Sequence, residues 1–236
     1  MLPQEYEGRL RELLNVFLAE NQKLNLTALR TEKDCWIGNV LDALALLDLF
    51  SETLHPTTPR LRGAGRSIPT MLDIGTGGGF PLLPLAITMP ESQFTGLDAT
   101  KKKIDAVQRI LEHIHCSNVR IICRRVEELA HEPDHRAQYD VVLARAVAPL
   151  NVLLEYSAPF AKKNGKLVFW KSMHIKEELE ESLAARSILS CHLVHTHTYE
   201  LPEGFGKRQL LLFEKMAETK EEYPRAIGMP SKKPLV

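Results

Sequence analysis

The sequence predicts an α/β fold with a mostly parallel sheet, an antiparallel strand at its C-terminal end and a helical N-terminal extension. Three observations support this prediction. From residue 69 onward, short apolar runs alternate with helical patterns, which is typical of strand–helix–strand units. The first apolar run ends in a glycine-rich turn. The N-terminal third instead has the apolar spacing of amphipathic helices.

Two helices are expected in the N-terminal third. The apolar positions on one face of the first are Leu10, Leu13, Leu14, Phe17 and Leu18. The second is expected to begin at Thr31, with Asp34 as a loose capping box, and to end near Phe50. The residues expected on its buried face are Val40, Leu41, Leu44 and Leu47.

The remaining elements follow from the alternating patterns. Strands are expected at 70–74, 94–98, 119–123, 140–144, 166–170, 191–199 and 207–214, and helices at 80–89, 101–115, 149–161 and 175–188. The short link between the last two strands favours an antiparallel pair. The chain is thus divided into a helical extension (1–55), a basic linker loop (56–69), the sheet domain (70–215) and a basic tail (216–236).

The composition excludes several classes of protein. The chain has 236 residues, of which 44% are hydrophobic and 25% charged, so a mostly disordered chain is excluded. Lys and Arg number 30, as do Asp and Glu, which excludes a globally basic nucleic-acid binder but not a local basic face. Neither a membrane span nor a secretory signal is evident, so a cytoplasmic protein is expected.

The cysteines give no sign of a metal site. Cys35, Cys116, Cys123 and Cys191 are far apart and lack the histidine spacing of a zinc site. Free thiols and no metal are therefore expected. The protein is also expected to be a monomer.

The glycine-rich turn is the first feature that indicates a ligand. It reads Asp73-Ile74-Gly75-Thr76-Gly77-Gly78-Gly79-Phe80, and such a turn lets the backbone approach a ligand closely. The dinucleotide pattern Gly-x-Gly-x-x-Gly fails, because it would need glycine at Phe80 or Leu82. The motif Asp-x-Gly-x-Gly-x-Gly instead resembles motif I of class I S-adenosylmethionine-dependent methyltransferases. The alternative is a tight turn with no ligand.

The two following strand ends fit the same class. Asp98 ends the next expected strand, where a carboxylate can accept both ribose hydroxyls, and it could also cap the following helix. Val126 and Glu127 follow the third strand, in the loop that lies over adenine in such folds. The predicted sheet is therefore of the class I, Rossmann-like methyltransferase type, with S-adenosylmethionine as cofactor.

The residues after the fourth strand narrow the substrate. Arg145 lies there in place of the Asn/Asp-Pro-Pro-aromatic motif of many base amino-group methylators. Neither Cys123 nor Cys191 has the Pro-Cys context needed for attack on a pyrimidine. Exocyclic amines and pyrimidine C5 are thus disfavoured as acceptors.

Further segments extend the match over nearly the whole chain. They are Asn25-Leu26-Thr27-Ala28, Leu41-Asp42, Phe80-Pro81, Ala144-Arg145-Ala146, Phe169-Trp170-Lys171, Lys207-Arg208 and much of 223–235. With them the sequence resembles the glucose-inhibited division protein B (RsmG) family of bacterial 16S ribosomal RNA guanine-N7 methyltransferases. The resemblance implies S-adenosylmethionine as methyl donor. It implies a guanosine N7 in 16S rRNA of the small ribosomal subunit as acceptor.

The resemblance and the motifs together name the expected site. The expected cofactor-binding residues are Asp73, Gly75, Gly77, Gly79, Phe80, Asp98, Val126, Glu127 and Arg145. Arg145 is also expected to orient the guanine through O6, or the cofactor, with a structural salt bridge as the alternative. Guanine N7 carries a lone pair and no proton, so no general base is required. The cations expected to hold RNA phosphates are Lys171, Arg208, Arg225, Lys232 and Lys233, each of which could also be an ordinary solvated cation.

Some positions depart from the family pattern. Gly38-Asn39 stands where Arg-His is usual, and Gln209 where His is common. These positions are expected to face RNA rather than cofactor. Two other hypotheses stay open: a methyltransferase for another RNA, a protein or a small molecule on the same fold, and a non-catalytic RNA-binding assembly protein that keeps the cofactor pocket.

Overall fold

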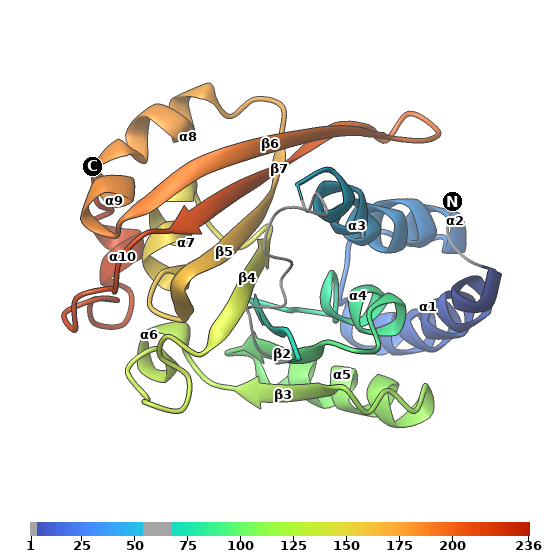
Figure 1. Cartoon of the computed structure of the whole chain (residues 1–236). Coiled ribbons are helices and arrows are strands. Elements are labelled where there is room, and N and C mark those ends of the chain that lie inside the picture. Colours follow the sequence, from blue (N-terminus) through green and yellow to red (C-terminus); the bar gives the residue numbers. More distant parts are fainter. Residues whose placement is uncertain (1–3, 54–67) are drawn as a thin grey trace.

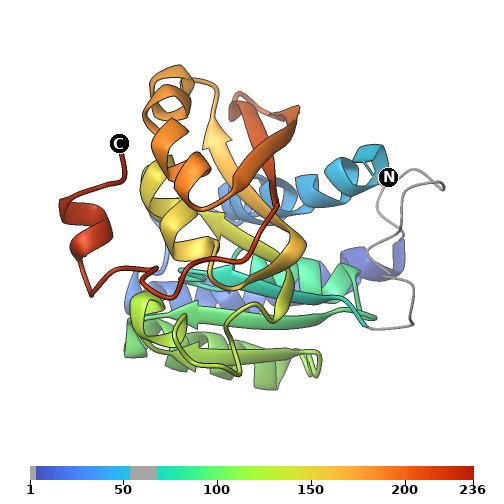
Figure 2. The same cartoon turned by 60° about the vertical axis from the view of Figure 1, so that its left-hand side comes forward.

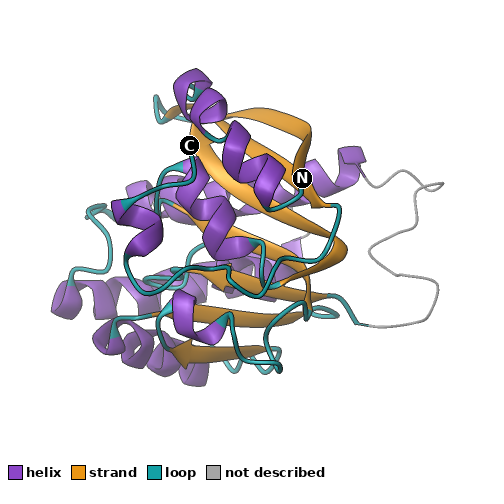
Figure 3. Ribbon diagram, turned by 90° about the vertical axis from the view of Figure 1, so that its left-hand side faces the viewer, coloured by secondary structure: helices purple, strands orange, loops and turns teal. Residues whose placement is uncertain are grey.

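The computed structural model describes residues 4–53 and 68–236, which form one seven-stranded sheet with helices on both sides (Figures 1 and 3). The strands are β1 (Thr70–Ile74), β2 (Gln93–Asp98), β3 (Val119–Cys123), β4 (Tyr139–Arg145), β5 (Ala161–Ser172), β6 (Cys191–Leu201) and β7 (Gly206–Lys215). Their order is β3-β2-β1-β4-β5-β7-β6. The first five strands are parallel, and β7 runs antiparallel to both β5 and β6. The predicted fold class is confirmed.

Each inner strand is buried on both faces. Met71 and Leu143 pack into one apolar cluster, with α4 (Leu82–Thr88), α5 (Lys101–His113) and the N-terminal helices. Leu72 and Val142, which are adjacent to them in sequence, pack into the other cluster. Successive strand side chains point to opposite faces, so a strand covered on both sides is a continuous apolar run. That is why these strands were visible in the sequence.

The second face is covered by helices from the C-terminal half. They are α6 (Val126–Leu129), α7 (Leu150–Ser157), α8 (Lys176–Glu181) and α9 (Leu183–Ile188). The single helix expected at 175–188 is thus two short helices. Beyond β7 the chain runs back along this face to α10 (Met229–Lys232), as Figure 2 shows.

The N-terminal helices pack on the first face. In α1 (Gln4–Leu24), four of the five predicted apolar positions are fully buried, and Leu18 is half-buried. The four are Leu10, Leu13, Leu14 and Phe17. A second helical stretch is formed without interruption by α2 (Glu32–Cys35), the π-helical η1 (Trp36–Leu41) and α3 (Asp42–Thr53). The hydroxyl of Thr31 accepts from the backbone N–H of Asp34 at 3.0 Å, which confirms the predicted cap.

The buried face of this second stretch differs partly from the expectation. Val40 and Leu44 are buried as expected, but Leu41 and Leu47 are only half-buried, while Leu46 and Leu49 are fully buried. A π-turn contains one residue more than an α-turn and rotates the following residues around the helix axis. The α-helical period used on the sequence therefore gives the correct face for Leu44 but the wrong face for Leu46, Leu47 and Leu49.

Three further expectations concern the linker, membrane spans and the cysteines. The predicted linker 56–69 lies almost entirely outside the described residues. Within the described ranges, no helix has both the length and the apolarity to cross a bilayer. The four cysteines are free thiols.

Candidate active site

The glycine turn after β1 depends on close packing. The backbone N–H groups of Gly75 and Thr76 both donate to the carbonyl of Leu97 at the end of β2, at 2.7 and 3.0 Å. Gly75 has φ +68°, and a Cβ there would lie 2.7 Å from Cγ2 of Val147. Only glycine meets both conditions without strain, so the turn is held against β2 and the loop after β4.

Asp98 is held at the end of β2 by two backbone donors. Its Oδ2 accepts from the N–H of Gly77 at 3.0 Å, and its Oδ1 accepts from the N–H of Thr100 at 2.8 Å. A carboxylate has about four lone-pair sites, so each oxygen can accept one more hydrogen bond. The carboxylate is therefore oriented and still able to bind a pair of hydroxyl groups.

A cleft of about 380 Å³ opens between these strand ends. Its lining includes Gly75, Asp98, Val126 and Glu127, so the structure brings these four predicted residues together. Lys103 and Arg125 also line the cleft, and sequence analysis had not singled them out.

The C-terminal segment contributes to the same cleft. Oε1 of the buried Glu127 accepts from the N–H of Gly228 at 3.0 Å and from the hydroxyl of Tyr156 at 3.3 Å. The Tyr156 hydroxyl lies 3.0 Å from the hydroxyl of Ser231, and both residues line the cleft. Tyr156 lies in no motif, and Ser231 lies in the matching segment 223–235 without having been assigned to the cofactor site. Only the fold brings the two residues to Glu127.

Asp73 lies on the face of β1 that points away from the cleft, and it is sealed from solvent. It is 1% exposed, and among the described residues neither carboxylate oxygen has a hydrogen-bond partner. Burial raises the pKa of Asp73 to about 7, although the nearby Thr76 hydroxyl and the charge of Arg145 oppose the rise. A buried carboxylate without a partner is costly. A ligand ammonium group would satisfy it, so this residue fits the cationic amino-acid part of S-adenosylmethionine.

Phe80 packs in the core behind the glycine turn. Its ring meets that of Phe17 edge to face, with centroids 4.8 Å apart. A Cβ at Gly78 would lie 2.9 Å from Cε2 of Phe17. The N-terminal helix α1 thus supports the turn from behind.

Arg145 lies at the carboxyl end of β4 within a polar network. Its Nη1 donates to the carbonyl of Gly38 at 3.0 Å and to Oδ2 of Asp42 at 2.9 Å, and its Nη2 donates to Oδ1 of Asn39 at 2.9 Å. The other Asp42 oxygen accepts from the hydroxyl of Tyr199 at 2.5 Å. The family departures Gly38 and Asn39 therefore touch Arg145 itself, a link that sequence spacing could not reveal.

The remaining predicted cations fall into two groups. Lys171 is bonded to Glu178 at 2.6 Å, and Arg225 holds the fully buried Glu155 through its backbone N–H and its guanidinium, at 2.6–2.9 Å. These two cations are engaged within the protein.

The second group is more open to solvent. Lys232 and Lys233 are exposed beside Ser231 at the cleft, and Arg208 is half-buried. Gln209, which departs from the family pattern, lies opposite Lys171 across β5 and β7. Its Nε2 donates to the carbonyl of Ser172 at 2.6 Å.

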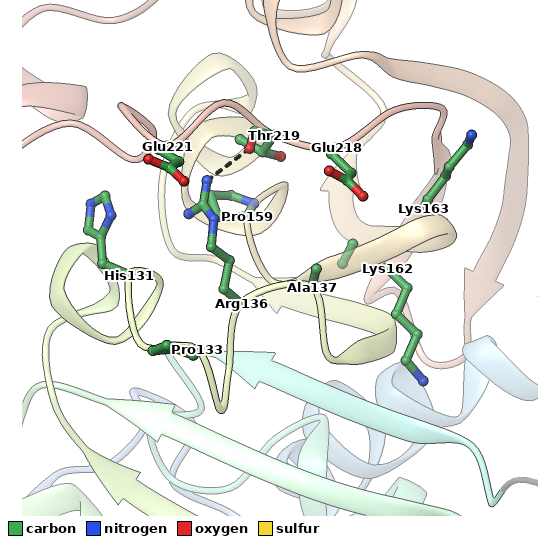
Figure 4. Close-up of a pocket in the computed structure, with 11 residues that line it drawn as sticks. His131, Pro133, Arg136, Ala137, Pro159, Lys162, Lys163, Glu218, Thr219 and Glu221 are labelled. Carbon is green, nitrogen blue, oxygen red and sulfur yellow. Dashed lines mark hydrogen bonds between the residues drawn. The ribbon is translucent and has the colours of Figure 1, made fainter.

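A larger cavity than this cleft, of about 820 Å³, lies elsewhere, at the amino ends of β4 and β5 (Figure 4). Arg136 extends into it, and its guanidinium donates to four backbone carbonyls, those of Ala130, Thr219, Lys220 and Tyr223. These bonds anchor the C-terminal segment, so Arg136 has a structural role.

The fold and the cleft together define a Rossmann-like, S-adenosylmethionine-dependent methyltransferase. A solved S-adenosylmethionine-dependent methyltransferase from Aquifex aeolicus shares the fold, with TM-score 0.53 and 15% identity over 78% of this chain and 93% of that one. Magnesium protoporphyrin IX methyltransferase from Synechocystis, solved with bound S-adenosylmethionine, gives TM-score 0.55 and 12% identity over 78% and 83%.

The particular family follows from the sequence comparison. The family model for rRNA small subunit methyltransferase G (GidB) matches residues 7–210, and the chain belongs to this family. Ribosomal RNA small subunit methyltransferase G of Alkaliphilus metalliredigens is 34% identical over 232 residues, covering 97% of this chain and 92% of the relative. The protein of the same name from Lactococcus lactis is 36% identical over 216 residues, covering 91% of this chain and 85% of the relative. The predicted family, enzyme class and cofactor are confirmed.

Proposed function

We propose that this chain transfers the methyl group of S-adenosylmethionine to N7 of a guanine in 16S rRNA of the small ribosomal subunit, in the cytoplasm. Membership of the rRNA small subunit methyltransferase G family carries the proposal. The arrangement of the strand ends supports it, because cofactor-binding groups and Arg145 meet along one edge of the sheet.

Each side chain of the cofactor site is assigned a role in binding. Asp98 accepts the ribose hydroxyls, and Val126 and Glu127 lie beside the adenine. Asp73 is buried and does not line the cleft, and we assign it to the amino group because its carboxylate has no partner within the described residues. When bound, S-adenosylmethionine supplies a methyl group on a sulfonium centre, which the N7 lone pair can attack directly. The turn at Gly75 and the donors to Asp98 hold these groups in place, so the chain contributes positioning.

The acceptor half fits a nucleophile that needs no base. Arg145 and Lys171 are cations held by Asp42 and Glu178, and neither can take up a proton. The contacts of Arg145 within the described chain use three of its five N–H donors. The Nε donor and one Nη2 donor remain for guanine. Because N7 must stay free to react, we assign them to guanine O6.

Labelled methyl transfer tests the proposal. Unmethylated small ribosomal subunits, purified 16S rRNA and a protein extract would each be incubated with labelled cofactor, followed by nucleoside analysis. Label recovered as 7-methylguanosine in 16S rRNA is expected. Label in protein or small molecules would move the function to another methyltransferase class, and RNA binding without any transfer would indicate a non-catalytic assembly protein.

A matched pair of variants tests the RNA surface. Replacing Lys232 and Lys233 by Ala is expected to weaken rRNA binding and to reduce its salt slope by about 0.7–0.9 for each phosphate that the two lysines neutralise. S-adenosylmethionine affinity should stay unchanged. Replacing Lys163 and Lys220 by Ala removes the same charge near the cavity of Figure 4, away from the cleft, and should leave the slope unchanged.

A further inference from the structure

A cluster of two imidazoles and a carboxylate lies outside the methyl-transfer site. Glu52 is in the last turn of α3, and His195 and His197 are on β6. One potential ligand atom from each residue lies within 4.8 Å of the other two. Oε2 of Glu52 is 2.8 Å from Nδ1 of His197 and 3.5 Å from Nε2 of His195.

We propose that Glu52, His195 and His197 bind a divalent transition-metal ion of the Zn²⁺ class, which joins the end of α3 to the edge strand β6. Two imidazoles and one carboxylate are a usual tridentate set for zinc, with water in the fourth position. This site goes beyond the proposed methyl transfer and departs from the sequence expectation of no metal.

The distances allow coordination after a small adjustment. Within the described chain, the buried Nε2 of His195 has no hydrogen-bond partner, and its 3.5 Å separation from Glu52 leaves that pair outside the hydrogen bonds found. Zinc bonds of about 2.0–2.1 Å in a tetrahedron place neighbouring ligand atoms about 3.3 Å apart. The His195 separation is already close to this value. The His197 separation would have to open by roughly half an ångström to reach it.

The fold explains why these side chains converge. His195 and His197 are two residues apart on a strand and so point to the same face, and a register shift beside His195 marks a bulge. Strand β6 is at the edge of the sheet, and α3 packs against it. The carbonyl end of a helix also favours a cation, and Glu52 lies at that end of α3.

The cluster is linked to the network around Arg145. His197 is buried and stacks on Tyr199, with ring centroids 5.9 Å apart. Tyr199 in turn donates to Asp42, the partner of Arg145. The ion would therefore stabilise the frame that holds Arg145, with no part in the reaction.

Metal binding by the full-length, tag-free protein tests the proposal. After removal of metals with a chelator, Zn²⁺ would be titrated calorimetrically and Co²⁺ followed by its absorption spectrum. One ion per chain, tetrahedral Co²⁺ bands and a higher Tm with Zn²⁺ but not with Mg²⁺ are expected. Failure of the protein to bind one equivalent of Zn²⁺ would overturn the site, whatever its methyltransferase activity.

Single variants then identify the ligands. Glu52→Gln and His195→Asn alter partly exposed side chains and should each weaken Zn²⁺ binding by at least about tenfold. His192→Asn removes an exposed histidine of the same strand that is not part of the cluster, and it serves as the matched control, with binding unchanged. Equal affinity in all three variants would show that the ion binds elsewhere and would refute the assignment.

Discussion

The cofactor side and the acceptor side of the sheet edge are built in different ways. At the ends of β1 and β2, backbone groups hold the site together. The N–H of Gly75 holds the turn, and the N–H of Gly77 orients Asp98. At the end of β4, side chains hold the site together, because Arg145 is bound by Asp42 and Asn39. One side leaves Asp73 without a partner, whereas the other pairs its charged groups internally.

The two sides differ in how far apart their contacting residues lie in the sequence. Gly77 and Asp98 are 21 residues apart, but Arg145 is 103 residues from Asp42, and Asp42 is 157 residues from Tyr199. A site made by one strand–turn–helix unit and the next strand appears as a motif. A site made by three distant elements does not. Four predictions, from the largest expected effect to the smallest, test this contrast.

Substitutions on the acceptor side should lower the free energy of unfolding more than substitutions on the cofactor side. Arg145→Met leaves Asp42, whose side chain is 10% exposed, without its cation, and should lower the free energy of unfolding by about 3–5 kcal/mol. Urea unfolding measures this. The double variant with Asp42→Asn should recover part of the loss, and a loss below about 1 kcal/mol in the single variant would show that the network is not a unit.

The C-terminal segment is the long-range part of the cofactor side. Arg225→Met leaves the fully buried Glu155 unpaired and should cost about 2–4 kcal/mol, somewhat less than Arg145→Met because Arg225 is more exposed. Cofactor affinity should fall as well, because Gly228 and Ser231 contact Glu127 and Tyr156. Chemical denaturation and calorimetry check both effects. Lys232→Ala, in an exposed neighbour, is the control and should change neither.

Asp73→Asn should have opposite effects on binding and on stability. Losing a charged hydrogen bond of about 1.5–3 kcal/mol should weaken S-adenosylmethionine binding roughly 10- to 150-fold. The cofactor-free protein should become more stable above pH 7, because the variant removes a buried carboxylate without a partner. Calorimetry and thermal unfolding measure the two. A lower Tm for the variant would mean that Asp73 has a partner in the free protein.

The pKa of Asp73 also predicts a pH dependence. Since folding raises this pKa from 3.8 to about 7, the folded cofactor-free protein binds more protons than the unfolded chain between these values. Its stability should therefore fall as pH rises through this window. Cofactor binding requires the ionised carboxylate, so affinity should rise about tenfold from pH 6 to pH 8. Calorimetry across this range measures it, and a dependence that persists in Asp73→Asn would assign it to another group.

Much of the fold was predictable because its signals are local. The inner strands β1, β2, β4 and β5 contain apolar runs covered on both faces, and the cap at Thr31 follows from residues three apart. The π-turn at 36–41 was not predictable, because it is decided by how the stretch packs against α1 and the β6–β7 hairpin. At Gly38, a Cβ would lie 2.7 Å from Leu29 and 3.1 Å from Phe205.

The sequence by itself determined the α/β class, the glycine turn, the acid at the end of β2 and the family, because each depends on neighbouring residues or on a match along the whole chain. Only the tertiary structure decided that Arg145 is bound to Asp42, that Arg225 holds Glu155, that Ser231 reaches the cofactor cleft and that Glu52 meets two histidines. A charged residue in a sequence has no assigned partner. Its partner depends on which distant elements the packed core brings within a few ångströms, and that core forms through the cooperation of the whole chain.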